Sequence, residues 1–280
     1  MVKVTETPVH IGQGEGLSAV LTRPTETDPS RPVFVILNAG LLHRVGPFRL
    51  HVQLARRLAE EGFPALRLDM SGLGYSPKHP EHQGKEAALE DADRVFRWLQ
   101  SELPSPRPVL LGSCSGAEMA HRIALADDRV AGCVFLDGYA YHTAQSKLRY
   151  YGSRVHRPDM WSKWLQSRLG PAGAEQDAAT DEEEEGFWES DVPPLEQFRA
   201  DLDRLVARTM PLLFVYSGSV REYQYPEQFF DLCPGAHKGP VTVRYFPNAD
   251  HTYLFERDRR ALLDAVSDWA TTYWPGEDRG

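Results

Sequence analysis

Cysteine is scarce in this chain, whose 280 residues include three, Cys114, Cys133 and Cys233. They show no paired spacing, which argues against a disulfide framework and against a zinc site. We therefore expect no bound metal and no cofactor. A free thiol persists in a reducing compartment, so the cysteine usage favours a cytoplasmic location.

Long hydrophobic runs and excess positive charge are also absent. No apolar segment approaches the roughly 18 residues of a membrane span, and the first residues lack the apolar stretch of a secretory signal. The formal net charge is −9 without a basic cluster, so we do not expect nucleic acid as a partner. The glycines of GQGEG lack a strand–turn–helix setting, which excludes a dinucleotide fingerprint. We expect the partner to be a small-molecule substrate, and the sequence does not indicate an oligomeric state.

Short apolar runs alternate with helical periodicity along most of the chain. The predicted strands cover residues 2–11, 17–22, 33–37, 64–69, 107–112, 129–138, 210–218 and 241–249, and the predicted helices cover 48–62, 86–103, 115–126 and 259–274. The first two strands read as an antiparallel hairpin. The alternation that follows predicts a mostly parallel eight-stranded sheet with helices on both faces.

The alternation breaks between residues 139 and 208. This region is rich in tyrosine and tryptophan and contains the acidic run DEEEE at Asp181–Glu185. We interpret it as a helical lid inserted into an α/β core formed by residues 1–138 and 209–280. The acidic run is more typical of a solvated loop than of a metal site.

Residues 112–116 read Gly-Ser-Cys-Ser-Gly and lie between a predicted strand and a predicted helix. This is the G-x-S-x-G outline of a nucleophile elbow with cysteine in place of serine. Gly112 and Gly116 lack the Cβ atoms that would clash in so tight a turn. The N–H groups at the start of the helix favour a thiolate at this position, so Cys114 is the candidate nucleophile. Cys133 and Cys233 have core-like surroundings.

Several segments resemble, in order, those of the α/β-hydrolase superfamily. They are VFVILNAGLLHRVGP, LRLDMSGLGYS, GSCSG, LLFVYSGSVRE and YFPNADHTYLF. The cysteine elbow resembles that of dienelactone hydrolases and polyhydroxyalkanoate synthases. The loop LNAGLLHRVGP is similar to that of hydrolases associated with exosortase systems. The resemblance implies the α/β-hydrolase fold.

The resemblance also implies a catalytic histidine and a carboxylate that orients it. His251 occupies the place of the superfamily's base. The acid normally follows the strand LLFVYSG, and Glu222 is the nearest carboxylate there. Asp137, at the end of the preceding strand, is the alternative. Asp69 ends another predicted strand, where we expect it to hold a loop by hydrogen bonds.

An oxyanion hole should lie beside the nucleophile. We expect one donor to be the backbone N–H of Ser115 and the other to come from Gly40 or Leu41. His43, in the same loop, is a candidate for lining the substrate pocket, with a surface position as the alternative.

A thiolate–histidine pair under an oxyanion hole attacks a carbonyl carbon and forms a thioester acyl-enzyme. Our main hypothesis is a hydrolase or acyltransferase acting on an ester or thioester of a hydrophobic acyl group, free or bound to a carrier. One alternative keeps the fold but opens lactones or cleaves carbon–carbon bonds. Another is a non-enzymatic binding protein of the same fold.

Overall fold

The structure is a computed structural model that describes residues 3–12, 16–26, 28–82, 84–104, 106–155 and 192–276. The strands are β1 (Val4–Ile11), β2 (Leu17–Pro24), β3 (Val33–Ile36), β4 (Ala65–Leu68), β5 (Pro108–Ser113), β6 (Gly132–Leu136), β7 (Leu212–Ser217) and β8 (Val241–Phe246). The α-helices are α1 (Leu50–Glu60), α2 (Gly84–Glu102), α3 (Ser115–Ala126), α4 (Ala144–Val155), α6 (Leu195–Ala207), α7 (Gln228–Leu232) and α8 (Glu256–Tyr273). Two short 3₁₀-helices are η1 (Pro47–Arg49) and η2 (Pro234–Lys238).

All eight strands form one sheet in the order β1-β2-β4-β3-β5-β6-β7-β8. The hairpin of β1 and β2 is antiparallel, as predicted, and β2 also pairs antiparallel with β4. The remaining pairs are parallel. The prediction of a mostly parallel eight-stranded sheet is therefore confirmed.

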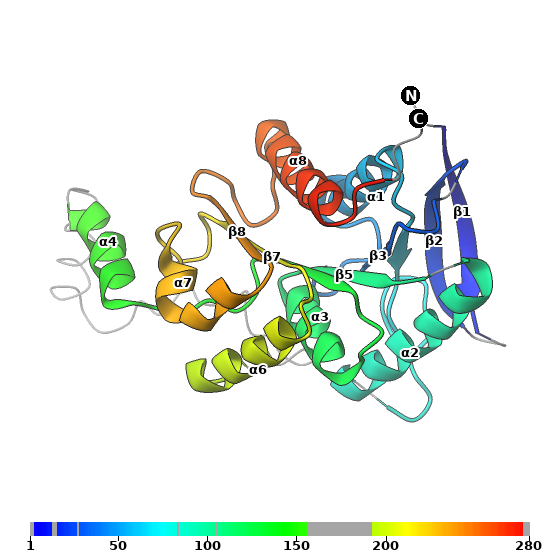
Figure 1. Cartoon of the computed structure of the whole chain (residues 1–280), viewed down its shortest axis with the longest axis horizontal. Helices are drawn as coiled ribbons and strands as arrows, with labels where there is room; N and C mark the ends of the chain where they lie inside the picture. The colour runs from blue at the N-terminus through cyan, green and yellow to red at the C-terminus, as the bar shows by residue number, and fades with distance from the viewer. Residues whose placement is uncertain are drawn as a thin grey trace, which may run out of the picture.

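Helices cover the two faces of this sheet, with α1 and α8 on one side and α2, α3 and α6 on the other (Figure 1). Successive residues of a central strand pack on opposite faces. In β5, Leu110 joins the cluster beneath α2, α3 and α6, whereas Val109 and Leu111 join the cluster beneath α1 and α8. This two-sided burial explains why β3 and β5 are continuous apolar runs without polar alternation.

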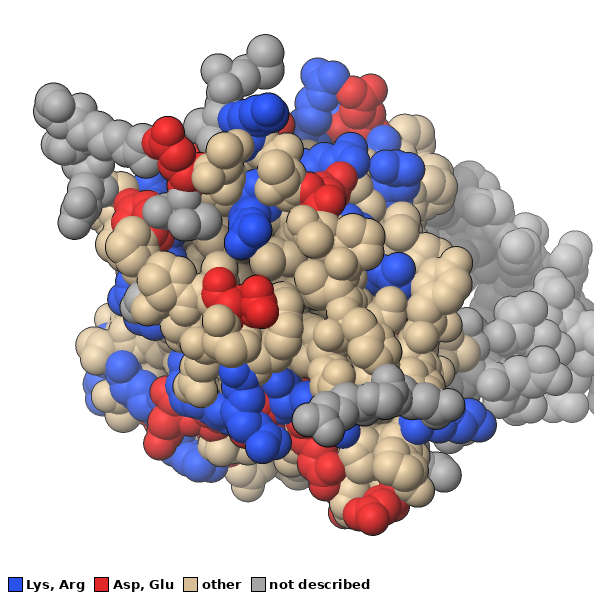
Figure 2. Space-filling view, turned by 90° about the vertical axis from the view of Figure 1, so that its right-hand side faces the viewer, with Lys and Arg blue, Asp and Glu red and all other residues tan. Residues whose placement is uncertain are grey.

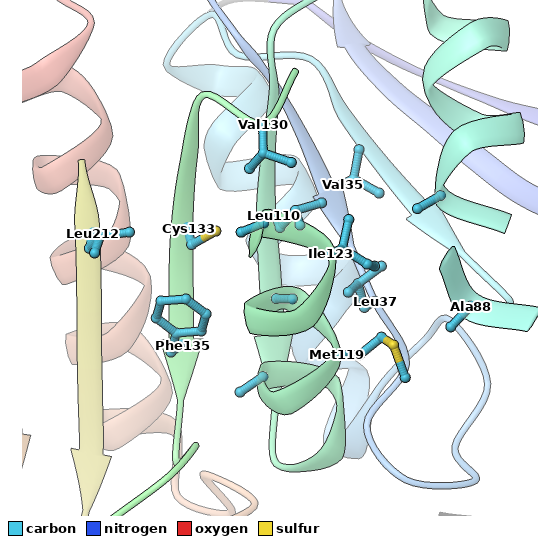
Figure 3. Close-up of a cluster of buried hydrophobic side chains, with 14 of the residues drawn as sticks. Val35, Leu37, Ala88, Leu110, Met119, Ile123, Val130, Cys133, Phe135 and Leu212 are labelled. Carbon is cyan, nitrogen blue, oxygen red and sulfur yellow. The ribbon is translucent and has the colours of Figure 1, made fainter. Parts of the chain in front are cut away.

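Cys133 belongs to the first of these clusters, where its side chain lies near Leu110 and Phe135 (Figure 3). It is fully buried, and burial raises the pKa of its thiol well above the ordinary value. Cys233 is also buried, with a pKa raised to about 11 for the same reason. Both cysteines are core residues, as predicted.

The β1 edge of the sheet is held by an ion-pair cluster. Glu6 on β1 accepts hydrogen bonds from Arg67 of β4 and Arg56 of α1 at 2.9 and 2.5 Å.

The face of the molecule turned toward the viewer in Figure 2 has acidic and basic side chains interspersed among broad uncharged areas. Within the described part of the chain, no helix is both long and apolar enough to cross a bilayer.

The last helix of the predicted lid region, α6, packs against the face of the sheet as the core helices do. α6 buries Phe198, Leu202 and Leu205 in the same cluster as α3, so this part of the interval 139–208 belongs to the helical layer of the core. α4 lies beyond α7, away from the sheet (Figure 1). The acidic run Asp181–Glu185 lies outside the described residues, and the lid itself remains a prediction.

The core can be tested with two phenylalanines of opposite burial. Phe34 of β3 is fully buried and meets Phe63 edge-on at 5.6 Å between ring centroids. We expect Phe34→Ala to lower the free energy of unfolding by about 3–5 kcal/mol, because it removes a large buried ring and leaves a cavity. Phe255, which is 60% exposed, is the control, and Phe255→Ala should change it by less than about 0.5 kcal/mol. Urea denaturation measures both, and equal losses would contradict the two-sided core.

Candidate active site

Cys114 occupies the turn between β5 and α3 in an unusual backbone conformation. Its φ is 55° and its ψ is −124°, a region that costs a residue with a side chain about 1–3 kcal/mol. Such strain persists only where the surrounding structure enforces it. Cys114 is exposed, whereas Cys133 and Cys233 are buried. The strained turn thus presents one accessible sulfur at the end of a central strand.

The two glycines of the motif enforce this turn by close backbone approach. A Cβ atom at Gly112 would overlap the carbonyl oxygen of Gly116, and a Cβ atom at Gly116 would overlap the carbonyl oxygen of Asn38. β5 can therefore reverse into α3, and α3 can lie against the end of β3, only with glycine at both positions. The clash predicted from the G-x-C-x-G motif is the contact that the structure shows.

His251 lies in the loop between β8 and α8 and connects two other groups of the site. Its Nδ1 atom is 2.8 Å from Oδ2 of Asp137. Hydrogen bonding of the imidazole to the Asp137 carboxylate first, and to the Cys114 side chain second, raises the pKa of His251 to about 10. The imidazole is thus bonded to the Asp137 carboxylate and interacts with the Cys114 side chain, and its protonated form is favoured at neutral pH.

Asp137 follows β6 directly and is held by backbone and side chain of the next strand. Its own N–H donates to the carbonyl of Val215 at 2.9 Å, and its φ is 48°. Ser217 donates its backbone N–H to Oδ1 at 2.6 Å and its hydroxyl to Oδ2 at 2.7 Å. With the His251 contact, the buried carboxylate accepts three hydrogen bonds.

Glu222, the carboxylate favoured from the sequence, does not contact His251. Its side chain is 42% exposed and lies 3.9 Å from Nε2 of His142. The chain turns away after β7 because Gly218 donates its N–H to the carbonyls of Phe246 and Ala249, at 2.9 and 3.0 Å. This turn carries Glu222 away from His251, so the carboxylate that contacts the imidazole is that of Asp137 and not the one favoured from the sequence. The sequence feature that pointed to Asp137 was its position at the end of the buried strand GCVFLDG.

The expected oxyanion donors lie around the elbow, and one of them is already engaged. The N–H of Gly40 donates to the hydroxyl of Ser115 at 2.9 Å. Ser115 is the first residue of α3, where helix geometry leaves N–H groups without intrahelical partners. Leu41 is half exposed in the same loop. His43 is exposed, and its Nδ1 accepts the N–H of Val45 at 3.3 Å, so it takes the surface position.

Asp69 fixes the loop that follows β3, as predicted. It is fully buried, and Oδ1 accepts the backbone N–H of Arg44 at 2.6 Å and Nδ2 of Asn38 at 3.2 Å. The guanidinium of Arg44 forms an ion pair with the same carboxylate. The carboxylate therefore ties the loop carrying Gly40 and Leu41 to the end of β4.

A cavity of about 10 Å³ borders the elbow, lined by Leu37, Asn38, Gly40, Met70, Leu73, Ser115, Gly116 and Met119. This is the room of a single water molecule. Met119 and Leu37 are seen together beside α3 in Figure 3. Among the described residues, no group of three or more His, Cys, Asp or Glu side chains fits a metal ion.

Comparisons with known proteins agree with this architecture. A sequence profile described as "alpha/beta hydrolase fold" matches residues 32–169. Est1E of Butyrivibrio proteoclasticus, solved with ferulic acid, has a TM-score of 0.60 at 17% identity, covering 94% of this chain and 98% of that one. An esterase of Pyrococcus furiosus has a TM-score of 0.59 at 16% identity, with 97% and 91% covered. A thioesterase domain of the curacin biosynthetic pathway has a TM-score of 0.54 at 16% identity, with 96% and 99% covered.

No curated protein sequence matches the chain. The identities to the solved structures are low enough that the likeness concerns the fold alone. Together with the observed sheet order, the comparisons show that the chain has the α/β-hydrolase fold, as the sequence predicted.

The two candidate carboxylates can be separated by the titration of His251. We expect Asp137→Asn to lower the pKa of His251 from about 10 by about 1–3 pH units, because the largest cause of the raised value is removed. Glu222→Gln should leave that pKa unchanged. Histidine NMR signals followed over pH measure both variants. A larger shift in Glu222→Gln would return the acid to its sequence-based assignment.

Proposed function

We propose that Cys114, His251 and Asp137 form the catalytic triad of a hydrolase or acyltransferase that acts on esters or thioesters of hydrophobic acyl groups. The observation that carries the proposal is that the His251 imidazole is bonded to the Asp137 carboxylate and interacts with the Cys114 side chain. A nucleophile, a base within its reach and a group that orients the base are the parts of covalent acyl transfer.

In the proposed reaction the Cys114 thiolate attacks the carbonyl carbon, and a C–S bond forms as the carbonyl electrons move to oxygen. The oxyanion collapses, the bond to the leaving group breaks, and the leaving group takes the proton of the His251 imidazolium. The neutral imidazole then takes a proton from water or another acceptor, which attacks the thioester. The thiolate leaves, and the imidazolium is restored.

Two backbone amides are the candidates for stabilising the oxyanion. The N–H of Ser115 is at the positive end of α3, next to the reacting sulfur. Because Gly40 donates to the Ser115 hydroxyl, we assign the second donor to Leu41. Donors fixed in place before the charge develops stabilise a transition state strongly.

The substrate class follows from the nucleophile and agrees with two of the structural neighbours. Sulfur leaves well from a thioester, and a thioester acyl-enzyme reacts more readily with amines or thiols than with water. The neighbours include a protein described as an esterase and one described as a thioesterase domain. Their substrates belong to the two classes proposed here, while the triad geometry of this chain carries the assignment.

Acyl capture can be observed directly by intact mass. After incubation with p-nitrophenyl esters of increasing chain length, we expect one acyl adduct on the wild-type protein and none on Cys114→Ala. Cys233→Ala is the matched control and should keep the adduct, because Cys233 is buried. An adduct that survives in Cys114→Ala, or its absence with every donor, would contradict the proposal, and the second result would favour a binding protein.

Serine at the same position tests why the chain uses cysteine. We expect Cys114→Ser to keep the fold but to reduce kcat/KM by about 10²–10⁴-fold, because a hydroxyl does not ionise beside an imidazolium. Ester hydrolysis rates and circular dichroism measure activity and fold. Full activity in this variant would remove the argument from ionisation. Adding amine or alcohol acceptors to the wild-type assay separates hydrolysis from transfer.

A further inference from the structure

The segment Ser217-Gly218-Ser219, at the end of β7, touches both Asp137 and the His251 loop. Ser217 is fully buried and donates two hydrogen bonds to the Asp137 carboxylate, one from its backbone and one from its hydroxyl. Ser219 accepts the backbone N–H of His251 on its hydroxyl at 3.0 Å. The segment therefore connects the acid of the site to the loop that carries the histidine.

The two bonds from Ser217 reach different oxygens of Asp137. The backbone N–H, fixed by the pairing of β7 with β8, bonds Oδ1, and the hydroxyl bonds Oδ2. Oδ2 is also the oxygen that lies 2.8 Å from Nδ1 of His251. Rotation of the carboxylate would break both bonds at once, so Ser217 keeps Oδ2 turned toward the imidazole.

The hydroxyl of Ser217 is itself held in place. While its hydrogen is donated to Asp137, its oxygen accepts the N–H of Ser219 at 3.3 Å. Gly218 anchors the segment to the loop after β8, and a Cβ atom there would overlap the carbonyl oxygen of Pro247. The donor that faces Oδ2 thus has one orientation rather than several.

We infer that Ser217 is a positioning residue that holds the Asp137 carboxylate in the orientation that bonds His251. The expected change in kcat rests on the proposed function, whereas the expected change in the pKa of His251 rests on the geometry alone. Ser217 acts through Asp137, because its backbone N–H and its hydroxyl both bond that carboxylate.

The test compares Ser217→Ala with Ser217→Thr, which keeps a hydroxyl, and with Ser267→Ala, which deletes a buried hydroxyl in α8. We expect Ser217→Ala to lower kcat about 10–100-fold with little change in KM, since a hydrogen bond to a charged group is lost. Ser217→Thr should recover most of this loss, and Ser267→Ala should behave as wild type. Should Ser217→Ala fail to fold, Ser217→Cys supplies a side chain of similar size with a weak donor and should give an intermediate kcat.

The titration of His251 supplies a readout that a merely structural serine would not move. We expect the pKa of His251 to fall in Ser217→Ala, because the contact that raises it depends on the orientation of Oδ2. The alternative is that the hydroxyl only reduces the negative charge on Oδ2. Its removal would then strengthen the bond from Oδ2 to His251 and raise the pKa of His251. That result would overturn the positioning role. An unchanged pKa would overturn it as well.

Failure of the proposed function has a different signature. If the wild type forms no acyl adduct but the pKa of His251 still falls in Ser217→Ala, the positioning role stands and the reaction is wrong. If the adduct forms and the pKa and kcat are both unaffected by Ser217→Ala, the reaction stands and the role of Ser217 is wrong.

Discussion

The hydrogen bond between Nδ1 of His251 and Oδ2 of Asp137 is the interaction on which the site depends. A buried carboxylate needs partners, and this one has three donors arranged around it. Their arrangement leaves the imidazole one orientation, with its other side available to the Cys114 sulfur. The same bond favours the protonated imidazole. The positive charge of His251 beside Cys114 therefore depends on Asp137.

The parallel sheet brings these groups together because β5, β6 and β7 are neighbours in register. Cys114, Asp137 and Ser217 stand at the carboxyl ends of these three strands, where the next residues must leave the sheet. Both Cys114 and Asp137 have positive φ there, so the strain lies at the end of the sheet that carries the candidate site. The cost is offset by the tight packing below, where successive residues of each strand fill opposite faces.

The strands of the sheet and the position of the elbow could be predicted from the sequence, because both depend on local sequence pattern. Apolar runs located the strands, and the glycines at positions 112 and 116 located the elbow. The carboxylate that contacts His251 could not be chosen in the same way, since two carboxylates stand near strand ends and the choice depends on the turn at Gly218. That turn is set by hydrogen bonds to the loop after β8, a contact between segments that no local pattern encodes. The engaged amide of Gly40 was hidden for the same reason.

A proton cycle connects the raised pKa of His251 to the use of cysteine. In the proposed reaction the proton already resides on the imidazole when substrate arrives, so attack by the thiolate requires no proton transfer. The leaving group removes that proton, and only then does His251 become a base, with Asp137 still bonded to Nδ1. Water, an alcohol and an amine can each return the proton, and the cycle closes in every case. In the proposed reaction the triad therefore determines that an acyl group is captured, whereas the residues that admit an acceptor above Cys114 determine where it goes.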